Sequence, residues 1–339
     1  MNKSLVFILI LLIAMLLLAC QNKELNKNIG VDRDVNIVSS KENIKTLKIE
    51  SLSDNFKLED IIDTPFNKAL IMGELGETRY IKEGYFKRDK GSLSYIDENG
   101  EIKNVVGIMI DPPSISITQA YYDMKSCLED EKVLFILLDG FGYHQYEYAK
   151  EKGFLSFLKD YEAKEALSVY KPVTNAGLAA IITGKTPEDN GVYSRKQREL
   201  KVDSIFKVAK DLNKDIAYVE GNIGILQTEV EPILNLDLNK DGYTDDEVYA
   251  STLKAIEEGK DFVFTHFHGI DDAGHSFGPL ADETMERIKL IDSYIENILF
   301  QWDGITIISA DHGMHSMDTA GDHGDFRYED LIVPYMIIR

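Results

Sequence analysis

From about residue 126 to the end of the chain, short apolar runs alternate with longer amphipathic segments. Five runs have the length and composition of buried strands, at residues 133–138, 216–219, 262–267, 305–308 and 335–338. Between them, apolar residues recur at helical spacing, as at Ile288, Ile291 and Ile295. Continuous apolar strands with helices between them are typical of a mostly parallel sheet covered on both faces. We therefore predict an α/β fold, a three-layer α/β/α sandwich, for residues 126–339.

Residues 47–125 have a different pattern, in which short apolar and polar positions alternate, as in Arg79-Tyr80-Ile81 and Leu93-Ser94-Tyr95-Ile96. Turn-forming residues interrupt these runs, and Asn99-Gly100 between two of them is a hairpin signal. We predict a small β-rich N-terminal extension here, with no visible chemistry of its own.

The first 46 residues differ from both parts. Lys3 precedes an almost unbroken apolar run, and Leu17-Leu18-Ala19-Cys20 resembles the lipobox of bacterial lipoproteins. Residues 1–20 are therefore predicted to be a lipoprotein signal peptide with Cys20 lipidated; an uncleaved membrane anchor is the alternative. Residues 21–46 are polar and predict a flexible tether. In either case we expect an extracytoplasmic protein attached to the bacterial cell membrane.

Charge and cysteine content narrow the possible functions. The formal charge of −21 disfavours nucleic acid as a partner, because it repels the phosphate backbone. Cys127 is the one cysteine after the lipobox, so the fold is expected to have no intramolecular disulfide. The acidic neighbours of Cys127 would not lower its pKa, which makes it a buried small residue rather than a catalytic thiol.

Metal-binding residue types concentrate where the predicted strands end. Asp139 follows the run 133–138, Asp271 and His275 follow 262–267, and Asp311-His312 follow 305–308. In open α/β sheets, ligands bind at the carboxyl ends of the strands. His323 lies in a glycine-flanked loop close behind, and six of the seven histidines fall between residues 266 and 323. Imidazole and carboxylate are ligands that Zn²⁺ prefers, so the pattern predicts a metal centre.

The order of these motifs resembles the alkaline phosphatase superfamily, and most closely its type I phosphodiesterase/nucleotide pyrophosphatase branch. The resemblance is carried by Leu-Asp-Gly at 138–140, Thr-Gly-x-x-Pro-Glu at 183–188, Asp-x-x-x-His at 271–275, Asp-His-Gly-Met at 311–314 and Gly-Asp-His-Gly at 321–324. It spans residues 132–339 and leaves the β-rich extension outside.

The resemblance implies two zinc ions and a nucleophile. One ion would be held by Asp139, Thr174, Asp311 and His312, and the other by Asp271, His275 and His323. Thr174 would be the nucleophile, since it lies nine residues before Thr183-Gly184 as in the family. Two metals a few ångströms apart can stabilise both oxygens of a displacement at phosphorus. Without the metal residues elsewhere, Thr174 would be interpreted as a plain helix N-cap.

Two further residues are expected at the substrate. Asn175 opens a predicted helix whose first N–H groups would face a phosphoryl oxygen. Arg195 stands where the phosphodiesterase branch has an asparagine that donates to phosphate. An arginine fork can bind two phosphate oxygens, which favours a monoester dianion. Arg195 is thus a hypothetical phosphate ligand, with a solvated surface charge as the alternative.

The remaining polar motifs leave their alternatives open. His266 and His268 share one strand face and support the ligands or pack in the core. His315 lines the cleft or is structural, whereas His144 is expected to be structural. Residues 237–242 resemble the start of a calcium loop, but Val248 stands at the twelfth position where a glutamate is needed, which favours an ordinary acidic turn.

Together these features predict a membrane-anchored, two-zinc hydrolase of small phosphate esters that forms a phospho-enzyme intermediate on Thr174. A phosphomonoesterase on the same fold is the alternative among enzymes. A catalytically inactive surface-binding lipoprotein is the alternative from another class. The sequence indicates neither a protein partner nor the natural substrate.

Overall fold

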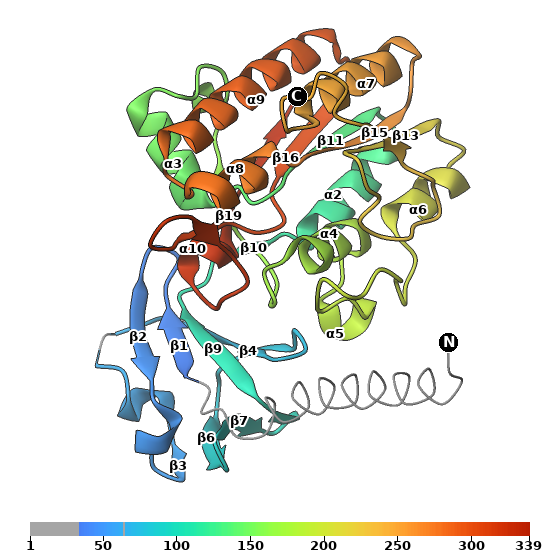
Figure 1. The fold of residues 1–339 in the computed structure, drawn as a ribbon. Helices are drawn as coiled ribbons and strands as arrows, with labels where there is room; N and C mark the ends of the chain where they lie inside the picture. Colours follow the sequence, from blue (N-terminus) through green and yellow to red (C-terminus); the bar gives the residue numbers. More distant parts are fainter. Residues whose placement is uncertain (1–33, 64) are drawn as a thin grey trace, which may run out of the picture.

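The computed structural model describes residues 34–63 and 65–339 of the chain. Its larger part is built on an eight-stranded sheet (Figure 1). In spatial order the strands are β10 (Ile115–Ser116), β12 (Lys164–Leu167), β19 (Ile332–Ile338), β16 (Ile305–Ser309), β11 (Val133–Leu138), β15 (Phe262–Phe267), β13 (Ile216–Glu220) and β14 (Ile233–Leu234). All neighbouring pairs are parallel except those that β19 makes with β12 and β16.

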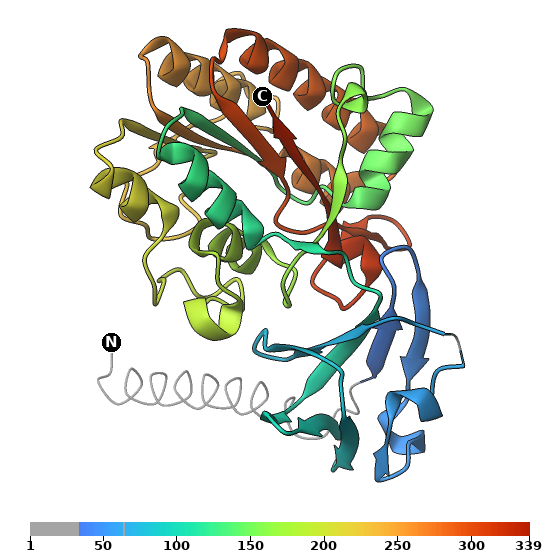
Figure 2. The same ribbon diagram turned by 180° about the vertical axis from the view of Figure 1, so that it is seen from behind.

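Helices cover both faces of this sheet, as Figures 1 and 2 show from opposite sides. One face carries α2 (Gln119–Leu128), α4 (Thr174–Thr183) and α6 (Ile205–Asp211), which contact one another. The other carries α3 (Tyr143–Lys152), α7 (Asp245–Glu257), α8 (Gly269–Phe277) and α9 (Asp282–Gln301). Short elements join them: α5 (Pro187–Asn190), the pair β17 (His315–Ser316) and β18 (Gly321–Asp322), and α10 (Tyr328–Leu331).

The predicted α/β sandwich is confirmed, and the differences lie at element ends and in one strand direction. The strand expected at 335–338 begins at Ile332 and runs antiparallel to its neighbours, so the sheet is mixed. Helix α6 starts at Ile205, because the Ser204 hydroxyl caps it by accepting the N–H of Phe206 (3.1 Å). Periodicity alone does not locate such a cap.

The core lies between the sheet and its two helix layers. The central strands β11 and β15 are buried along their whole length, which explains their uninterrupted apolar sequences. Phe135 stacks on Phe264 across this pair, with ring centroids 4.9 Å apart. The apolar stripe of α9 (Ile288, Ile291, Ile295, Ile298) is also buried. Each such side chain contributes roughly 1.5–3 kcal/mol of transfer free energy on folding.

The N-terminal β region, residues 34–111, contains two small sheets (Figure 1). The first has the order β2 (Asn43–Leu47), β1 (Val35–Val38), β9 (Val105–Ile110), β4 (Ala69–Gly73) and β5 (Thr78–Tyr80). The second has the order β3 (Asn55–Phe56), β6 (Gly84–Asp89), β7 (Ser92–Asp97) and β8 (Gly100–Ile102). The hairpin expected at Asn99-Gly100 is present, since Asp97 pairs with Gly100. Two 3₁₀ turns, Ile49–Ser51 and Leu58–Asp60, complete the region.

Two predicted boundaries are wrong. The tether expected over residues 21–46 does not extend past residue 33, because β1 and most of β2 lie in its second half, with Val35 and Ile37 fully buried. The catalytic body begins at β10 and not at residue 126, because β10 joins the large sheet and α2 packs on β11. Both errors concern short segments whose apolar residues are too few to show a period.

The N-terminal β region and the α/β body meet at a third apolar cluster, the interface cluster. It consists of Val38, Leu70, Met72 and Met109 from the first and Leu167, Phe326, Leu331 and Ile332 from the second. Gly107 on β9 allows the closest approach, because an added Cβ would lie 2.1 Å from the Phe326 ring. The β region therefore packs on the loop that follows His323.

The predicted signal peptide and the lipidation site Cys20 lie outside the described residues. Among the described residues, no helix combines the length and apolarity needed to cross a membrane.

Candidate metal centre

The centre forms where parallel strands end together. Asp139 follows β11, and Asp311 and His312 follow the neighbouring β16. Asp271 and His275 lie on α8, which begins directly after β15. His323 comes from the loop after β18. Because β11, β15 and β16 run parallel, their carboxyl ends bring these side chains to one edge of the sheet.

The first expected ligand set converges closely. Nε2 of His312 lies 3.3 Å from Oδ1 of Asp139 and 3.5 Å from Oδ2 of Asp311. The Thr174 hydroxyl lies 3.3 Å from the same His312 nitrogen and 3.4 Å from Oδ1 of Asp139. All four residues thus direct a ligand atom at one point.

The ligand atoms of the second expected set are slightly farther apart. Nε2 of His275 lies 3.4 Å from Oδ2 of Asp271, and Nε2 of His323 lies 3.6 Å from Oδ1 of the same carboxylate. The His312 and His323 rings stack at a centroid distance of 3.7 Å, so the two sets adjoin. His312 is close enough to serve either set, since Asp271, His312 and His323 also form a compact group of ligand atoms.

These separations fit zinc. Four ligands at about 2.0–2.1 Å in a tetrahedron lie about 3.3 Å from one another. The measured distances of 3.3–3.6 Å are therefore close to a ligand–ligand edge and long for hydrogen bonds. In addition, Oδ1 of Asp271 and Oδ2 of Asp311 are buried without a hydrogen-bond partner. A buried carboxylate oxygen without a donor is costly unless a cation satisfies it.

The tautomers of the three histidines also fit metal binding. Nδ1 of His312 faces the Gly313 carbonyl (2.9 Å), Nδ1 of His323 the Pro172 carbonyl (2.9 Å) and Nδ1 of His275 the Gly321 carbonyl (3.1 Å). Each ring therefore donates its Nδ1–H to the backbone and presents the Nε2 lone pair to the centre. This arrangement is how metal-bound histidines are generally oriented.

The pKa shifts reflect crowded negative charge. Burial and the charge of Asp139 raise the pKa of Asp311 to about 7. Burial opposes the charged form of His312, but Asp311 and Asp139 outweigh it and raise its pKa to about 10. Burial and the His312 charge lower the pKa of His323 to about 3. Zinc requires neutral histidines and ionised carboxylates, so binding a metal here would release protons.

Thr174 is the first residue of α4, and the N-cap position is held by Val173. The plain N-cap interpretation is therefore wrong, and the hydroxyl is directed at Asp139 and His312 instead. Gly177, one turn later, lets the helix approach, because an added Cβ would lie 2.4 Å from the Asp311 carbonyl oxygen. The first N–H groups of an α-helix have no partner within the helix and can bind an anion.

Arg195 contacts one of the expected metal ligands, His323. Its guanidinium donates to Nε2 of His323, the nitrogen expected to bind a metal. One lone pair cannot serve both, so a metal ion on His323 must displace Arg195 from this contact. The Asn175 amide has another role than expected: it donates to the Gln197 carbonyl (3.0 Å) and ties the loop that carries Arg195 to α4.

Two buried carboxylates that the sequence pattern did not reveal support the centre. Asp330 accepts the N–H groups of Gly324 and Asp325 (3.0 and 2.9 Å) and contacts Nδ1 of His315 at 2.8 Å. His315 is thus a structural brace of the His323 loop. Glu220, at the end of β13, contacts both His266 and His268. Only the strand-end position of Glu220 could have pointed to that residue, whereas Asp330 lies in α10 and carries no such signal.

The remaining motifs are placed away from the ligands. Burial and the charge of His315 lower the pKa of His144 to about 4, which fits a structural residue. In the calcium-like loop, the Asp237 carboxylate accepts the N–H groups of Lys240, Asp241 and Gly242. This is an ordinary acidic turn.

A cavity of about 560 Å³ is lined by residues of both regions. Lys171, Ser194 and Asp325 come from the α/β part, and Asn36 and Val106 from the N-terminal β region. In the sequence, Ser194 precedes Arg195, and Asp325 follows His323 by two residues.

Solved structures show a distant likeness. Phosphonoacetate hydrolase from Sinorhizobium meliloti, in complex with phosphonoacetate, is 18% identical, with a TM-score of 0.45 over 56% of this chain and 58% of that one. Human ectonucleotide pyrophosphatase/phosphodiesterase 5 is 16% identical, with a TM-score of 0.44 over 56% and 58%. A glycosaminoglycan 2-O-sulfatase, BT1596, is 12% identical, with a TM-score of 0.45 over 61% and 64%. Scores this low do not by themselves define a function.

Curated relatives match over a shorter stretch. GPI ethanolamine phosphate transferase 1 of Neurospora crassa is 31% identical over 91 residues, which is 25% of this chain and 9% of that protein. The catalytic subunit of human GPI ethanolamine phosphate transferase 3 is 33% identical over 66 residues, or 19% and 6%. The chain thus spans less than a tenth of the length of these two relatives.

A family model matches the part of the chain that carries most of the expected ligands. It covers residues 178–324, which contribute five of the seven expected ligands: Asp271, His275, Asp311, His312 and His323. Asp139 and Thr174 precede it. Over residues 178–324, this chain matches the Metalloenzyme superfamily.

Proposed function

We propose that this protein is a metal-dependent hydrolase of phosphate esters, of the phosphodiesterase/nucleotide pyrophosphatase type, with two zinc ions and Thr174 as the nucleophile. One observation carries the proposal. The Thr174 hydroxyl lies 3.3 Å from Nε2 of His312 and 3.4 Å from Oδ1 of Asp139, at the start of a helix. A hydroxyl in that place can be activated and aimed at an anionic phosphorus centre.

Each residue of the centre has a role in the proposed reaction. Asp139, Thr174, Asp311 and His312 would hold one zinc ion, and Asp271, His275 and His323 the other. The ions would supply charge stabilisation for the attacking and leaving oxygens. Thr174 attacks phosphorus, the ester oxygen leaves, and water then hydrolyses the phosphothreonine. The N–H groups at the start of α4 and the Arg195 guanidinium hold the phosphoryl oxygens.

The test combines metal analysis with an ester assay. The purified protein should contain zinc and cleave bis-nitrophenyl phosphate, and a chelator should abolish cleavage until zinc is restored. Thr174→Ala should lower kcat by about 10³-fold or more. Zinc should still bind, because Asp139, Asp311 and His312 remain as ligands and water can take the place of the neutral hydroxyl. Metal-free, inactive wild-type protein would instead favour a surface-binding lipoprotein.

Arg195 favours a second candidate, a phosphomonoesterase on the same residues. Its fork of donors can bind two of the three free oxygens of a monoester dianion, which carries more negative charge than a diester. Arg195→Asn should shift the ratio of bis-nitrophenyl to nitrophenyl phosphate hydrolysis toward the diester. An unchanged ratio would mean that Arg195 does not select the substrate.

The similarity to the curated relatives raises one further question: which group accepts the phosphoryl moiety. Their names describe ethanolamine phosphate transferases. Hydrolysis in the presence of ethanolamine or a sugar alcohol, followed by product analysis, would show transfer as a new phosphoester. Hydrolysis alone is our expectation.

We also propose that the protein is exported and anchored to the bacterial cell membrane through lipid on Cys20. The lipobox-like Leu17-Leu18-Ala19-Cys20 supports this. Metabolic labelling with a fatty acid should mark the wild type and not Cys20→Ser. Equal labelling of both proteins would contradict it.

A further inference from the structure

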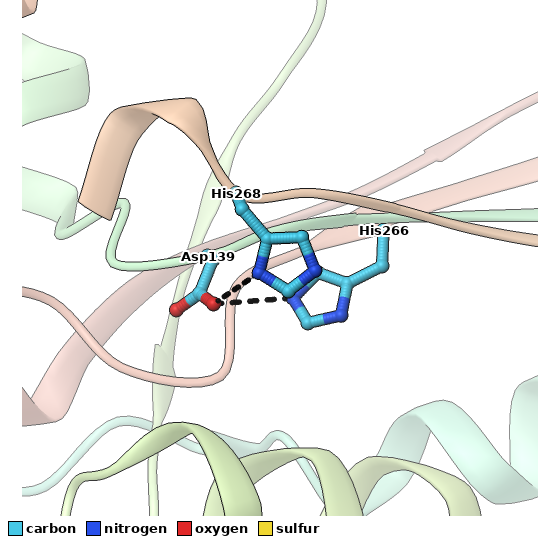
Figure 3. A group of neighbouring side chains, drawn as sticks. All are labelled: Asp139, His266 and His268. Carbon is cyan, nitrogen blue, oxygen red and sulfur yellow. Dashed lines mark hydrogen bonds and ion pairs between the residues drawn. The ribbon is translucent and has the colours of Figure 1, made fainter. Parts of the chain in front are cut away.

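The two oxygens of Asp139 face different surroundings. Oδ1 faces Thr174 and His312, as described above, whereas Oδ2 faces a second, deeper group made of His266 and His268 (Figure 3). Nε2 of His266 lies 3.3 Å from Oδ2, and Nδ1 of His268 lies 3.0 Å from it. The two rings stack at a centroid distance of 3.8 Å. This second group is not used by the proposed hydrolase.

Glu220 closes the group from the far side. A single oxygen, Oε2, contacts Nδ1 of His266 at 2.9 Å and Nε2 of His268 at 3.0 Å. If each ring donates its proton to this oxygen, both rings present a lone pair to Oδ2 of Asp139. One carboxylate holding the outer N–H of two histidines is an arrangement that orients metal ligands.

One ring nitrogen of the group lacks a partner. Nε2 of His266 is fully buried and has no hydrogen-bond partner among the described residues. A divalent cation between Nε2 of His266, Nδ1 of His268 and Oδ2 of Asp139 would be bound by all three atoms, with Glu220 holding the other nitrogen of each ring.

We propose that Asp139, His266 and His268 form a third divalent-cation site, with Glu220 as the residue that positions both histidines. The three ligand atoms lie within 4.8 Å of one another. The 3.3 Å separation of Nε2 of His266 and Oδ2 of Asp139 is close to a tetrahedral zinc edge of about 3.3 Å. Asp139 then bridges this site and the centre at Thr174, one oxygen to each.

The donor set indicates the kind of cation. Two imidazole nitrogens and one carboxylate oxygen suit Zn²⁺ or a similar transition metal, and are a poor set for Ca²⁺ or Mg²⁺. The site can be reached from the side of His268, whose side chain is 16% exposed while that of His266 is fully buried.

The test is a count of bound metal, independent of activity. Wild-type protein loaded with Zn²⁺ and freed of excess ion should contain three equivalents per chain. His266→Gln and His268→Gln should each contain one fewer than wild type. His144→Gln, a matched control at a histidine outside all three ligand sets, should contain as many as wild type. Glu220→Gln should weaken the affinity for one equivalent by about 10–100-fold, because it loosens both rings.

The number of zinc ions bound per wild-type chain tests the third site even where a variant fails to fold. Two equivalents would overturn the third site and leave the two-zinc hydrolase intact. None or one would overturn both proposals. Three equivalents that persist unchanged in folded His266→Gln and His268→Gln would place the extra ion elsewhere and also overturn the third site.

Discussion

The α/β body and the N-terminal β region are both ordered around apolar cores, yet the candidate chemistry lies in only one of them. In the body, parallel strands end together and bring Asp139, Asp311 and His312 to one edge. In the β region the sheets are mostly antiparallel, and no group of potential metal ligands is found among its described residues. Antiparallel strands end alternately at opposite edges, so they do not gather strand-end residues in this way.

The β region nevertheless contacts the loop that follows His323. Asn36 donates to the Phe326 carbonyl (3.1 Å), and Gly107 lies against the Phe326 ring. Asp330 holds the same loop from inside the body. The two regions therefore differ in role: the α/β body supplies the candidate ligands, and the β region supports a loop that carries one of them.

The largest expected effect is the loss of a ligand in the body. Asp311→Asn keeps the oxygen that accepts the Gly140 and His312 N–H groups, but it removes the charge of the unpartnered oxygen. We expect kcat/KM for phosphate esters to fall by about 10³-fold or more and zinc content to fall by one equivalent. Steady-state kinetics and metal analysis check this. Asp303→Asn, at an exposed carboxylate, is the control, and equal activity of both variants would exclude Asp311 as a ligand.

A smaller effect is expected where the body braces the His323 loop. Asp330→Asn removes an acceptor shared by two backbone N–H groups and the partner of His315. Because residues behind metal ligands orient them, we expect zinc affinity at one site to fall by about 10–100-fold. Competition with a chelator measures this affinity. Asp318→Asn, an exposed residue between β17 and β18, should leave it unchanged; an equal loss in both would show that the loop is not held by Asp330.

The contact between the two regions can be broken at Gly107. Gly107→Ala forces a methyl group into the Phe326 ring, and overpacking of this kind costs about 2–3 kcal/mol. Urea unfolding should show this loss, and Phe326→Leu in the same chain should recover part of it. If the double variant is as unstable as the sum of the single ones, the two residues do not interact. The ester KM should also rise, because the cavity wall moves.

The smallest expected effect concerns pH. His144 has a folded pKa of about 4, below the value of about 6.5 for an unfolded chain. Between these values the unfolded state binds a proton that the folded state does not, so stability falls as pH falls from 6.5 to 4. From pH 7 to pH 5, wild type should lose about 1–2 kcal/mol more than His144→Gln. Parallel pH dependence of the two proteins in urea unfolding would contradict this.

The sequence by itself determined much of the α/β body. The apolar runs located β11 and β15 to the residue, because strands buried on both faces must be apolar throughout. The motif order also singled out Thr174 and the residues that the structure gathers around it. In the β region the same approach missed β1, β4 and β9, although nearly all of their residues are buried.

Only the tertiary structure decided which side chains complete the centre and how. Glu220 and Asp330 are far along the chain from the ligands they support, and their importance depends on burial and distance, which spacing does not encode. Arg195 was singled out by its position, but its contact with His323 comes from loop packing. Likewise, Asp139 was predicted as one ligand, and the fold alone shows its second oxygen facing two histidines. Strand ends are fixed by local hydrophobic pattern, whereas partners across strands depend on the register of the whole sheet.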